Sequence, residues 1–138
     1  GCPPKVNLAE EKNNGEVIQK LIKNKIIDTS HDISDGGLLV ALTEMALSGN
    51  IGFELFLKKE FSNHKFLFSE DQSRYIITLQ NHKIDEAMSL LNEKRIQYLN
   101  LGKTKGAKII LNEEEISLKE LKNLHESWFD NYLSGKEN

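Results

Sequence analysis

Residues 31–46 read HDISDGGLLVALTEMA, which joins the densest polar cluster of the chain to its strongest helix signal. Apolar residues at positions 38, 39, 41, 42, 45 and 46 cover a wide face of a helix, which predicts a helix from Leu38 to Ser48. Gly49 is expected to cap its C-terminal end. Ser34-Asp35-Gly36-Gly37 forms the loop before this helix, because paired glycines favour a turn.

This loop has two possible roles. Ser34 or Asp35 could cap the following helix, with the glycines making the turn. Alternatively, the glycines let the backbone approach a ligand, the helix start attracts anions, and the carboxylates and hydroxyl suit a divalent cation. The second role would fit Mg²⁺ together with a phosphate group. The loop is no Walker P-loop, since no Gly-Lys-Ser/Thr follows, and the residues leave both roles open.

A second polar cluster, FSEDQSRY at residues 68–75, separates two apolar segments. Arg74 opens a strand expected to be buried, where an unpaired guanidinium would be costly. We therefore expect Arg74 to pair with Glu70 or Asp71, or to face an interface. A functional alternative is that Glu70 approaches a metal and Arg74 a phosphate.

The remaining patterns predict the order helix, strand, helix, several strands, helix, strands, helix. Asn7 could cap a helix whose start or kink is expected at Asn13-Asn14-Gly15, and Ser117 with Glu120 fits a capping box. The predicted helices are 8–27, 38–48, 85–94 (with Ile84, Ala87, Met88 and Leu91 inward) and 117–133, and the predicted strands are 26–33, 51–57, 75–79, 97–101 and 107–111. A short apolar piece at 66–68 is unassigned, and Gly102 and Gly106 are placed in a turn. The order predicts an α+β fold with a mixed or mainly antiparallel sheet covered by helices.

Composition limits the classes of function. The 138 residues are 38% hydrophobic and 28% charged, with a net charge of −3, which is typical of one globular domain and lacks the basic face of a nucleic-acid binder. The single cysteine, Cys2, excludes an internal disulfide. No membrane span or signal peptide is evident, which predicts a cytoplasmic protein. Residues 1–7, with both prolines, predict a linker or extended arm before one domain at 8–138, and the initial Gly indicates processing or a piece of something longer.

The two polar clusters together resemble a known enzyme family. Residues 31–46 closely resemble the H-D-x-S-D-G-G-L-x-V-A-L-x-E-M-A segment of the formylglycinamide ribonucleotide amidotransferases, also called phosphoribosylformylglycinamidine synthases. Residues 68–75 resemble the family's F-S/G-E-x-Q-x-R-Y segment, and residues 101–104 its I-G-x-T/V turn. The similarity runs from about Pro3 to the closing helix. Other members of the superfamily, such as aminoimidazole ribonucleotide (AIR) synthase, carry different versions of the first segment and lack the second.

The resemblance implies a fold and a reaction. The fold would be that of the AIR synthase C-terminal domain, which is partly ferredoxin-like. The reaction would be ATP-dependent ligation in purine biosynthesis, converting formylglycinamide ribonucleotide and glutamine-derived ammonia to formylglycinamidine ribonucleotide, ADP and phosphate. Carried over by position, Asp32 would be a Mg²⁺ ligand, and Ser34, Gly36 and Gly37 would contact the nucleotide, ATP or ADP. His31, Asp35, Glu70 and Arg74 would brace the loops or face an interface.

The resemblance also implies partners. They would be the other domains of the synthase subunit, a separate glutaminase subunit and a small accessory subunit, with neither nucleic acid nor membrane involved. The isolated domain would be inactive, because the principal ATP-binding residues of the family lie in earlier domains. In the shorter, separate-subunit form the site at Asp32 and Ser34 could be altered or empty. A different hypothesis is a free-standing nucleotide- or partner-binding module of the same fold.

Overall fold

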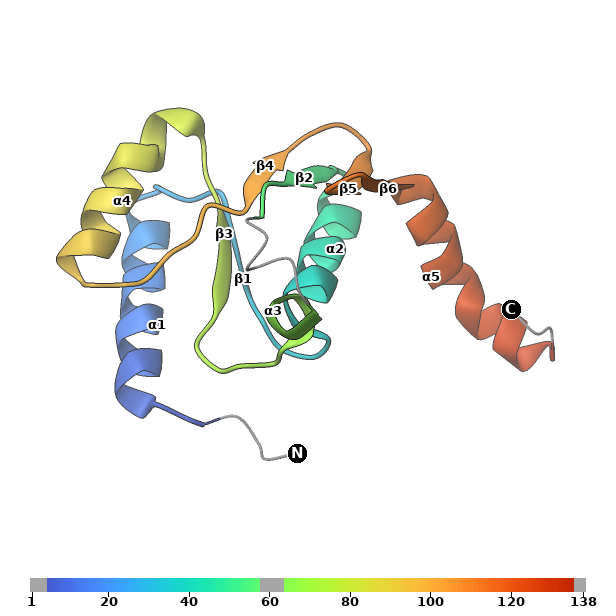
Figure 1. The fold of residues 1–138 in the computed structure, drawn as a ribbon, viewed down its shortest axis with the longest axis horizontal. Coiled ribbons are helices and arrows are strands. Elements are labelled where there is room, and N and C mark those ends of the chain that lie inside the picture. Colours follow the sequence, from blue (N-terminus) through green and yellow to red (C-terminus); the bar gives the residue numbers. More distant parts are fainter. Residues whose placement is uncertain (1–4, 58–63, 136–138) are drawn as a thin grey trace. The chain divides into compact units, whose positions relative to one another are not determined.

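The computed structural model describes residues 5–57 and 64–135. Cys2 and the first four residues of the predicted linker lie outside this part of the chain. The described residues form helices together with antiparallel and mixed strand pairings (Figure 1), which confirms the predicted α+β class. Their order is α1 (Leu8–Lys23), β1 (Thr29–Asp32), α2 (Gly37–Gly49), β2 (Phe53–Leu55), α3 (His64–Phe68), β3 (Tyr75–Thr78), the 3-10 helix η2 (Asn81–Lys83), α4 (Ile84–Glu93), β4 (Gly102–Thr104), β5 (Lys108–Leu111), β6 (Glu114–Ser117) and α5 (Leu118–Leu133).

The chain divides into two compact units, each built from two separate stretches. Unit 1 comprises residues 1–42 and 63–99, and unit 2 comprises residues 43–62 and 100–138. The boundary between them falls inside α2. Both polar clusters singled out in the sequence belong to unit 1, so the description of the site concerns that unit alone.

Unit 1 contains an antiparallel pair of strands and two packed helices. β1 pairs with β3 so that His31 lies opposite Ile76 and Asp32 opposite Tyr75. The register places the polar end of β1 beside the start of β3. Buried residues of α1, α4 and the turn after α1 form one core cluster, against which β3 packs through Ile77: Val17, Leu21, Ile26, Ile27, Ala87 and Leu91. Removing this apolar surface from water stabilises the unit.

Unit 2 contains a four-stranded sheet in the order β4-β2-β5-β6. β2 pairs antiparallel with β4 and parallel with β5, and β5 pairs antiparallel with β6. The sheet is therefore mixed, as predicted. Phe53, Leu55 and Ile109 are buried on its central strands, which is the alternation expected of a sheet with one covered face.

The predicted N-terminal caps of α1 and α5 are present. The Asn7 side chain accepts a hydrogen bond from the Glu10 N–H at the start of α1, and the Ser117 hydroxyl accepts one from the Glu120 N–H at the start of α5. The expected break near Gly15 is wrong, because α1 runs without interruption from Leu8 to Lys23.

Several predicted boundaries are also wrong. The strand expected at 97–101 lies instead at β4, so Gly102 is in a strand, and the apolar piece at 66–68 belongs to α3. β6 was not predicted because Glu114 and Glu115 make this edge strand look polar. Gly49 is the last residue of α2, and the left-handed conformation expected of a cap falls on Asn50. On α4, Ile84 and Met88 are 38% and 37% exposed, so only Ala87 and Leu91 are buried.

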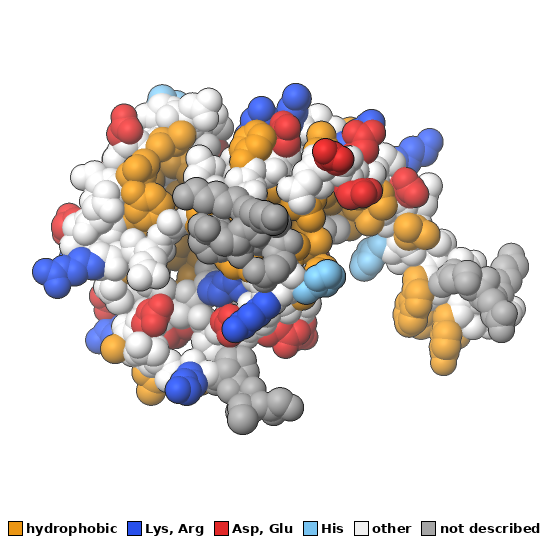
Figure 2. Space-filling model, in the orientation of Figure 1, with side chains coloured by type: hydrophobic (Ala, Val, Ile, Leu, Met, Phe, Trp, Pro, Cys, Tyr) orange, Lys and Arg blue, Asp and Glu red, His pale blue; other side chains and the backbone are white. Residues whose placement is uncertain are grey.

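α5 differs from the other long helices in what it exposes. Of its described residues only Leu118 is buried, whereas Trp128 is 54% and Tyr132 70% exposed. Figure 2 shows hydrophobic side chains gathered on the surface of this helix. The rings of Trp128 and Tyr132 stack on each other with centroids 5.7 Å apart. Among the described residues, no helix is long and apolar enough to cross a bilayer.

Candidate functional site

The loop between β1 and α2 takes its shape from two glycines. Gly36 and Gly37 have φ angles of 79° and 76°, a conformation that disfavours other residues. The Gly37 N–H donates to the Ser34 carbonyl at 3.1 Å and closes a turn. A Cβ on Gly37 would lie 2.6 Å from the Phe68 carbonyl carbon, so only glycine lets the loop lie this close to the end of α3.

The segment between α3 and β3 is held by Arg74. One nitrogen of the guanidinium donates to the Ser69 carbonyl and hydroxyl at 3.2 and 3.0 Å, and the other to the Phe66 carbonyl at 3.3 Å. The guanidinium also lies 5.1 Å from the centroid of the Phe66 ring. These carbonyls are at the C-terminal end of α3, where helical carbonyls lack intrahelical partners. Arg74 thus caps α3 from the position immediately before β3.

Two features of its surroundings shift the pKa of Arg74 in opposite directions. Burial lowers the pKa of the guanidinium, and the negative charge of Asp71 raises it. An arginine keeps its proton in either case. The sequence led us to expect that Arg74 pairs with Glu70 or Asp71, or faces an interface. Its hydrogen bonds go to carbonyl and hydroxyl oxygens, while Asp71 acts on it through its charge. Glu70 accepts a hydrogen bond from the loop instead.

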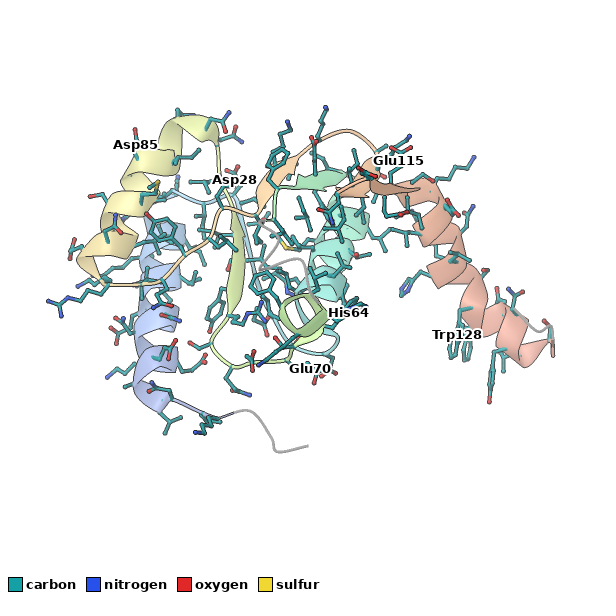
Figure 3. All side chains as sticks on the ribbon, viewed as in Figure 1. Asp28, His64, Glu70, Asp85, Glu115 and Trp128 are labelled. Atoms are coloured by element: carbon teal, nitrogen blue, oxygen red, sulfur yellow. The ribbon has the colours of Figure 1, made fainter. Side chains whose placement is uncertain are left out.

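Two backbone hydrogen-bond donors of the loop contact the other polar cluster directly. The Gly36 N–H donates to a carboxylate oxygen of Glu70 at 2.9 Å, and the Ile33 N–H donates to the Arg74 carbonyl at 2.8 Å. Glu70 lies where the chain leaves α3 (Figure 3). Residues 31–37 and 66–75, which are about 35 positions apart in the sequence, therefore form one structural feature.

A hollow of about 350 Å³ opens between these two segments within unit 1. It is lined by residues of β1, the loop, the segment before β3 and α1: Glu11, Asp32, Ile33, Ser34, Asp35, Glu70, Gln72, Ser73, Arg74 and Tyr75. Its lining holds four carboxylates and one guanidinium. Such an excess of negative charge favours a cation, and disfavours a phosphate that arrives without one.

The sequence-predicted residues are distributed unevenly around the hollow. Asp32, Ser34 and Asp35 line it and are exposed, whereas Gly36 is half-buried and Gly37 is buried beneath the loop. His31 is half-buried on β1, and its Nδ1 lies 2.5 Å from the Asp32 carbonyl oxygen. The Gly36 and Gly37 N–H groups are bound by Glu70 and by the Ser34 carbonyl, so neither uses the side-chain cap that we considered.

Sequence reasoning missed the contribution of α1. Glu11 accepts a hydrogen bond from the Tyr75 hydroxyl at 2.9 Å, and this bond, burial and the charges of Glu11 and Asp32 raise the Tyr75 pKa. Asn14 donates to Ser73. Glu11 and Asn14 are three positions apart and so share one helix face. No local signal singles out this face, because residues 9–16 (AEEKNNGE) are almost all polar.

These features belong to a known domain family. The family model described as AIR synthase related protein, C-terminal domain, matches residues 1–111. The chain therefore belongs to the family of AIR synthase related C-terminal domains. The matched region contains the loop, the segment before β3 and the α1 residues that line the hollow.

The curated relatives come from one kind of enzyme subunit. The chain is 42% identical over 135 residues to phosphoribosylformylglycinamidine synthase subunit PurL from Azorhizobium caulinodans, covering 96% of this chain and 18% of the relative. It is 41% identical over 138 residues to the subunit of the same name from Rhodopseudomonas palustris, covering 99% of this chain and 19% of the relative. The chain thus spans less than a fifth of the length of these relatives.

Solved structures share the fold. Thermotoga maritima PurL complexed with FGAR superimposes with a TM-score of 0.68 at 17% identity, covering 80% of this chain and 20% of that chain. T. maritima PurL complexed with ATP gives a TM-score of 0.65 at 16% identity, covering 78% and 21%. The structure of PurLQS from T. maritima gives 0.66 at 16% identity, covering 79% and 21%.

Proposed function

We propose that residues 8–138 are the C-terminal domain of a phosphoribosylformylglycinamidine synthase subunit. The whole subunit would convert formylglycinamide ribonucleotide, ammonia and ATP to formylglycinamidine ribonucleotide, ADP and phosphate in purine biosynthesis. The observation that carries this proposal is the identity of 42% to a PurL subunit over 96% of the chain. The fold shared with T. maritima PurL supports it independently.

Within this domain, the hollow would form part of a nucleotide site. Asp32 and Ser34 line the hollow and are exposed. The Asp32 carboxylate would be one ligand of a bound cation, and the Ser34 hydroxyl would contact a phosphate oxygen. Gly36 and Gly37 would shape the loop at the nucleotide. The loops around it would be braced by His31, Asp35, Glu70 and Arg74. Two contacts illustrate this role: Glu70 accepts a hydrogen bond from the Gly36 N–H, and Arg74 donates to the end of α3. The complexes of T. maritima PurL with ATP and ADP are consistent with a nucleotide as ligand.

The fit of Mg²⁺ to this chain is partial. Mg²⁺ prefers hard oxygen ligands in octahedral geometry, which the Asp32 carboxylate can supply in part. In the described ranges 5–57 and 64–135, no group of three His, Cys, Asp or Glu side chains could hold a metal ion. The remaining ligands would come from another part of the subunit, and Mg²⁺ would neutralise the nucleotide phosphates there.

The proposed partners follow from the same assignment. They are the other domains of the synthase subunit, a glutaminase subunit that supplies ammonia and a small accessory subunit, as the PurLQS assembly of T. maritima suggests. We place the activity in the cytoplasm. On its own the domain would be inactive, because it would lack the rest of the ATP site.

An activity assay tests this proposal. The full protein that carries this chain is incubated with ATP, Mg²⁺ and ammonia, and ADP release is measured with and without formylglycinamide ribonucleotide. We expect ADP release to depend on the ribonucleotide and to be lost when residues 8–138 are deleted. ADP release without that dependence would indicate another ATP-using member of the superfamily. Nucleotide binding without turnover would support the free-standing binding module.

A further inference from the structure

Asn14 stands out among the residues near the hollow because its position is unfavourable for its type. It lies in the middle of α1, where asparagine is a poor helix former. Its side-chain amide donates to the Ser73 carbonyl at 3.0 Å and to the Ser73 hydroxyl at 2.9 Å, and both side chains are half-buried. Asn14 therefore makes a specific tertiary contact across 59 positions of sequence.

Ser73 is in a conformation that needs such support. Its φ angle is 65°, in the left-handed region that non-glycine residues rarely adopt. A residue of this kind stays there only when its surroundings fix it. The two hydrogen bonds from Asn14 act on the Ser73 backbone and side chain together, and so oppose rotation of this residue toward a more favourable conformation.

One hydrogen bond connects the residue after Ser73 to the loop. The carbonyl of the next residue, Arg74, accepts the hydrogen bond from the Ile33 N–H at 2.8 Å. Ile33 lies between Asp32 and Ser34, the two residues proposed for the cation and the nucleotide. A rotation at Ser73 would redirect the Arg74 carbonyl and release this hydrogen bond.

We propose that Asn14 is a positioning residue for the hollow. Asn14 holds Ser73 in the left-handed conformation and so determines the orientation of the Arg74 carbonyl. The hydrogen bond from the Ile33 N–H to this carbonyl then determines the positions of Asp32 and Ser34. The effect on the loop follows from the contacts alone, and its consequence for Mg·nucleotide affinity rests on the proposed function. The hydrogen bond from the Tyr75 hydroxyl to Glu11 also connects this face of α1 to β3, and so helps to hold the segment before β3 in place.

The chain offers a matched control in Asn13. This residue is the neighbour of Asn14 on α1, is also half-buried, and donates from its amide to the Lys94 carbonyl at 3.2 Å, at the end of α4. Asn13→Ala therefore removes a similar tertiary bond that does not lead to the hollow. In both variants alanine is the better helix former, so we expect both proteins to fold.

The first experiment measures hydrogen exchange of the Ile33 amide by NMR in the ligand-free chain. In Asn14→Ala we expect this amide to exchange on the order of fivefold faster than in the wild type, relative to the core amide of Leu21. In Asn13→Ala we expect no change in that ratio. Equal ratios in the two variants would overturn the proposal. If Asn14→Ala does not fold, Asn14→Asp, which replaces the donor by an acceptor, is measured in the same way.

A rescue variant separates positioning from a general loss of stability. Glycine adopts positive φ without cost, so Ser73→Gly removes the need for support at this position. We expect the double variant Asn14→Ala/Ser73→Gly to recover most of the Ile33 protection. Failure of this rescue, with Asn14→Ala folded, would mean that Asn14 does not act through the Ser73 conformation.

The ligand arm uses ADP with Mg²⁺ and the full protein that carries the chain. Binding is measured by calorimetry, and we expect Asn14→Ala to weaken it on the order of fivefold while Asn13→Ala leaves it unchanged. If the wild type binds ADP and Asn14→Ala binds equally well, the positioning role is wrong. If no variant binds ADP but the exchange results hold, the proposed nucleotide site fails and the positioning of the loop stands.

Discussion

The loop at residues 33–37 and the segment at residues 66–75 form two sides of one hollow, but they keep their shapes by different means. The loop depends on what Gly36 and Gly37 lack, since a side chain on Gly37 would overlap the backbone of Phe68. The segment depends on what Arg74 supplies, which is three hydrogen bonds to the end of α3. The loop is therefore expected to be sensitive to a side chain added at Gly37, and the segment to the loss of the hydrogen-bond donors of Arg74.

The largest effect is expected from Gly37→Ala. The new Cβ would meet the Phe68 backbone at 2.6 Å in a left-handed conformation, so we expect a loss of about 3 kcal/mol or more in the free energy of unfolding. Chemical denaturation measures it. Gly106→Ala, with positive φ and open space, should cost only about 1 kcal/mol, and Gly15→Ala in α1 should stabilise by about 0.5–1 kcal/mol. Similar losses at all three positions would refute the steric explanation.

Arg74→Lys tests the segment. Lysine keeps the charge but lacks the planar fork that reaches Phe66 and Ser69 together, so we expect a loss of about 2 kcal/mol in the free energy of unfolding. Arg95 serves as the control, because it is exposed and follows the C-terminal end of α4. Arg95→Lys should change the free energy of unfolding by less than about 0.5 kcal/mol. If Arg74→Lys were as neutral as Arg95→Lys, the charge alone would hold the segment.

Glu70 joins the two sides, and its variants separate geometry from charge. Glu70→Ala removes the acceptor of the Gly36 N–H and should cost about 1 kcal/mol of unfolding free energy. Glu70→Gln keeps an acceptor and loses only the favourable charge near the start of α2, roughly 0.5 kcal/mol. Glu113→Gln is the control, because Glu113 is exposed in the turn between β5 and β6 and lies at no helix start. A Gln variant that is less stable than the Ala variant would contradict this assignment.

The smallest effect concerns pH. The pKa of Tyr75 in the folded chain is raised, mainly by its hydrogen bond to Glu11, so the neutral phenol is favoured in the folded state. The resulting stabilisation is fully present below the unfolded pKa of about 10 and is lost as the pH rises through the folded value. Glu11→Gln should therefore lower the Tyr75 pKa in a spectrophotometric titration. An unchanged titration would show that Glu11 does not control it.

Much of this architecture could be predicted from local sequence. The cap residues Asn7 and Ser117 and the apolar periodicities located the long helices, and the polar clusters at residues 31–37 and 68–75 located the hollow. Strand boundaries were less accurate, because β4 and β6 are short edge strands of unit 2 whose pairing, rather than residue type, defines them.

The contacts across the hollow could not be predicted. An arginine close in sequence to two carboxylates suggests an ion pair. Arg74 instead donates hydrogen bonds to the Ser69 and Phe66 carbonyls, which are brought together only when α3 forms. Asn14 looked like a weakness in α1, and its role depends on Ser73, 59 positions away. Local patterns indicate which residues are unusual, and the tertiary partner decides what each of them does.

The most direct test of the central claim is the Mg²⁺-dependent affinity of the full protein for ADP in wild type and in Asp32→Asn. Asparagine keeps the shape of Asp32 and removes the charge that a cation needs, so we expect affinity to fall on the order of tenfold or more in the presence of Mg²⁺. The variant should remain folded, because Asp32 is exposed. Equal affinity for Mg·ADP in the two folded proteins would contradict the assignment of this hollow to the nucleotide site.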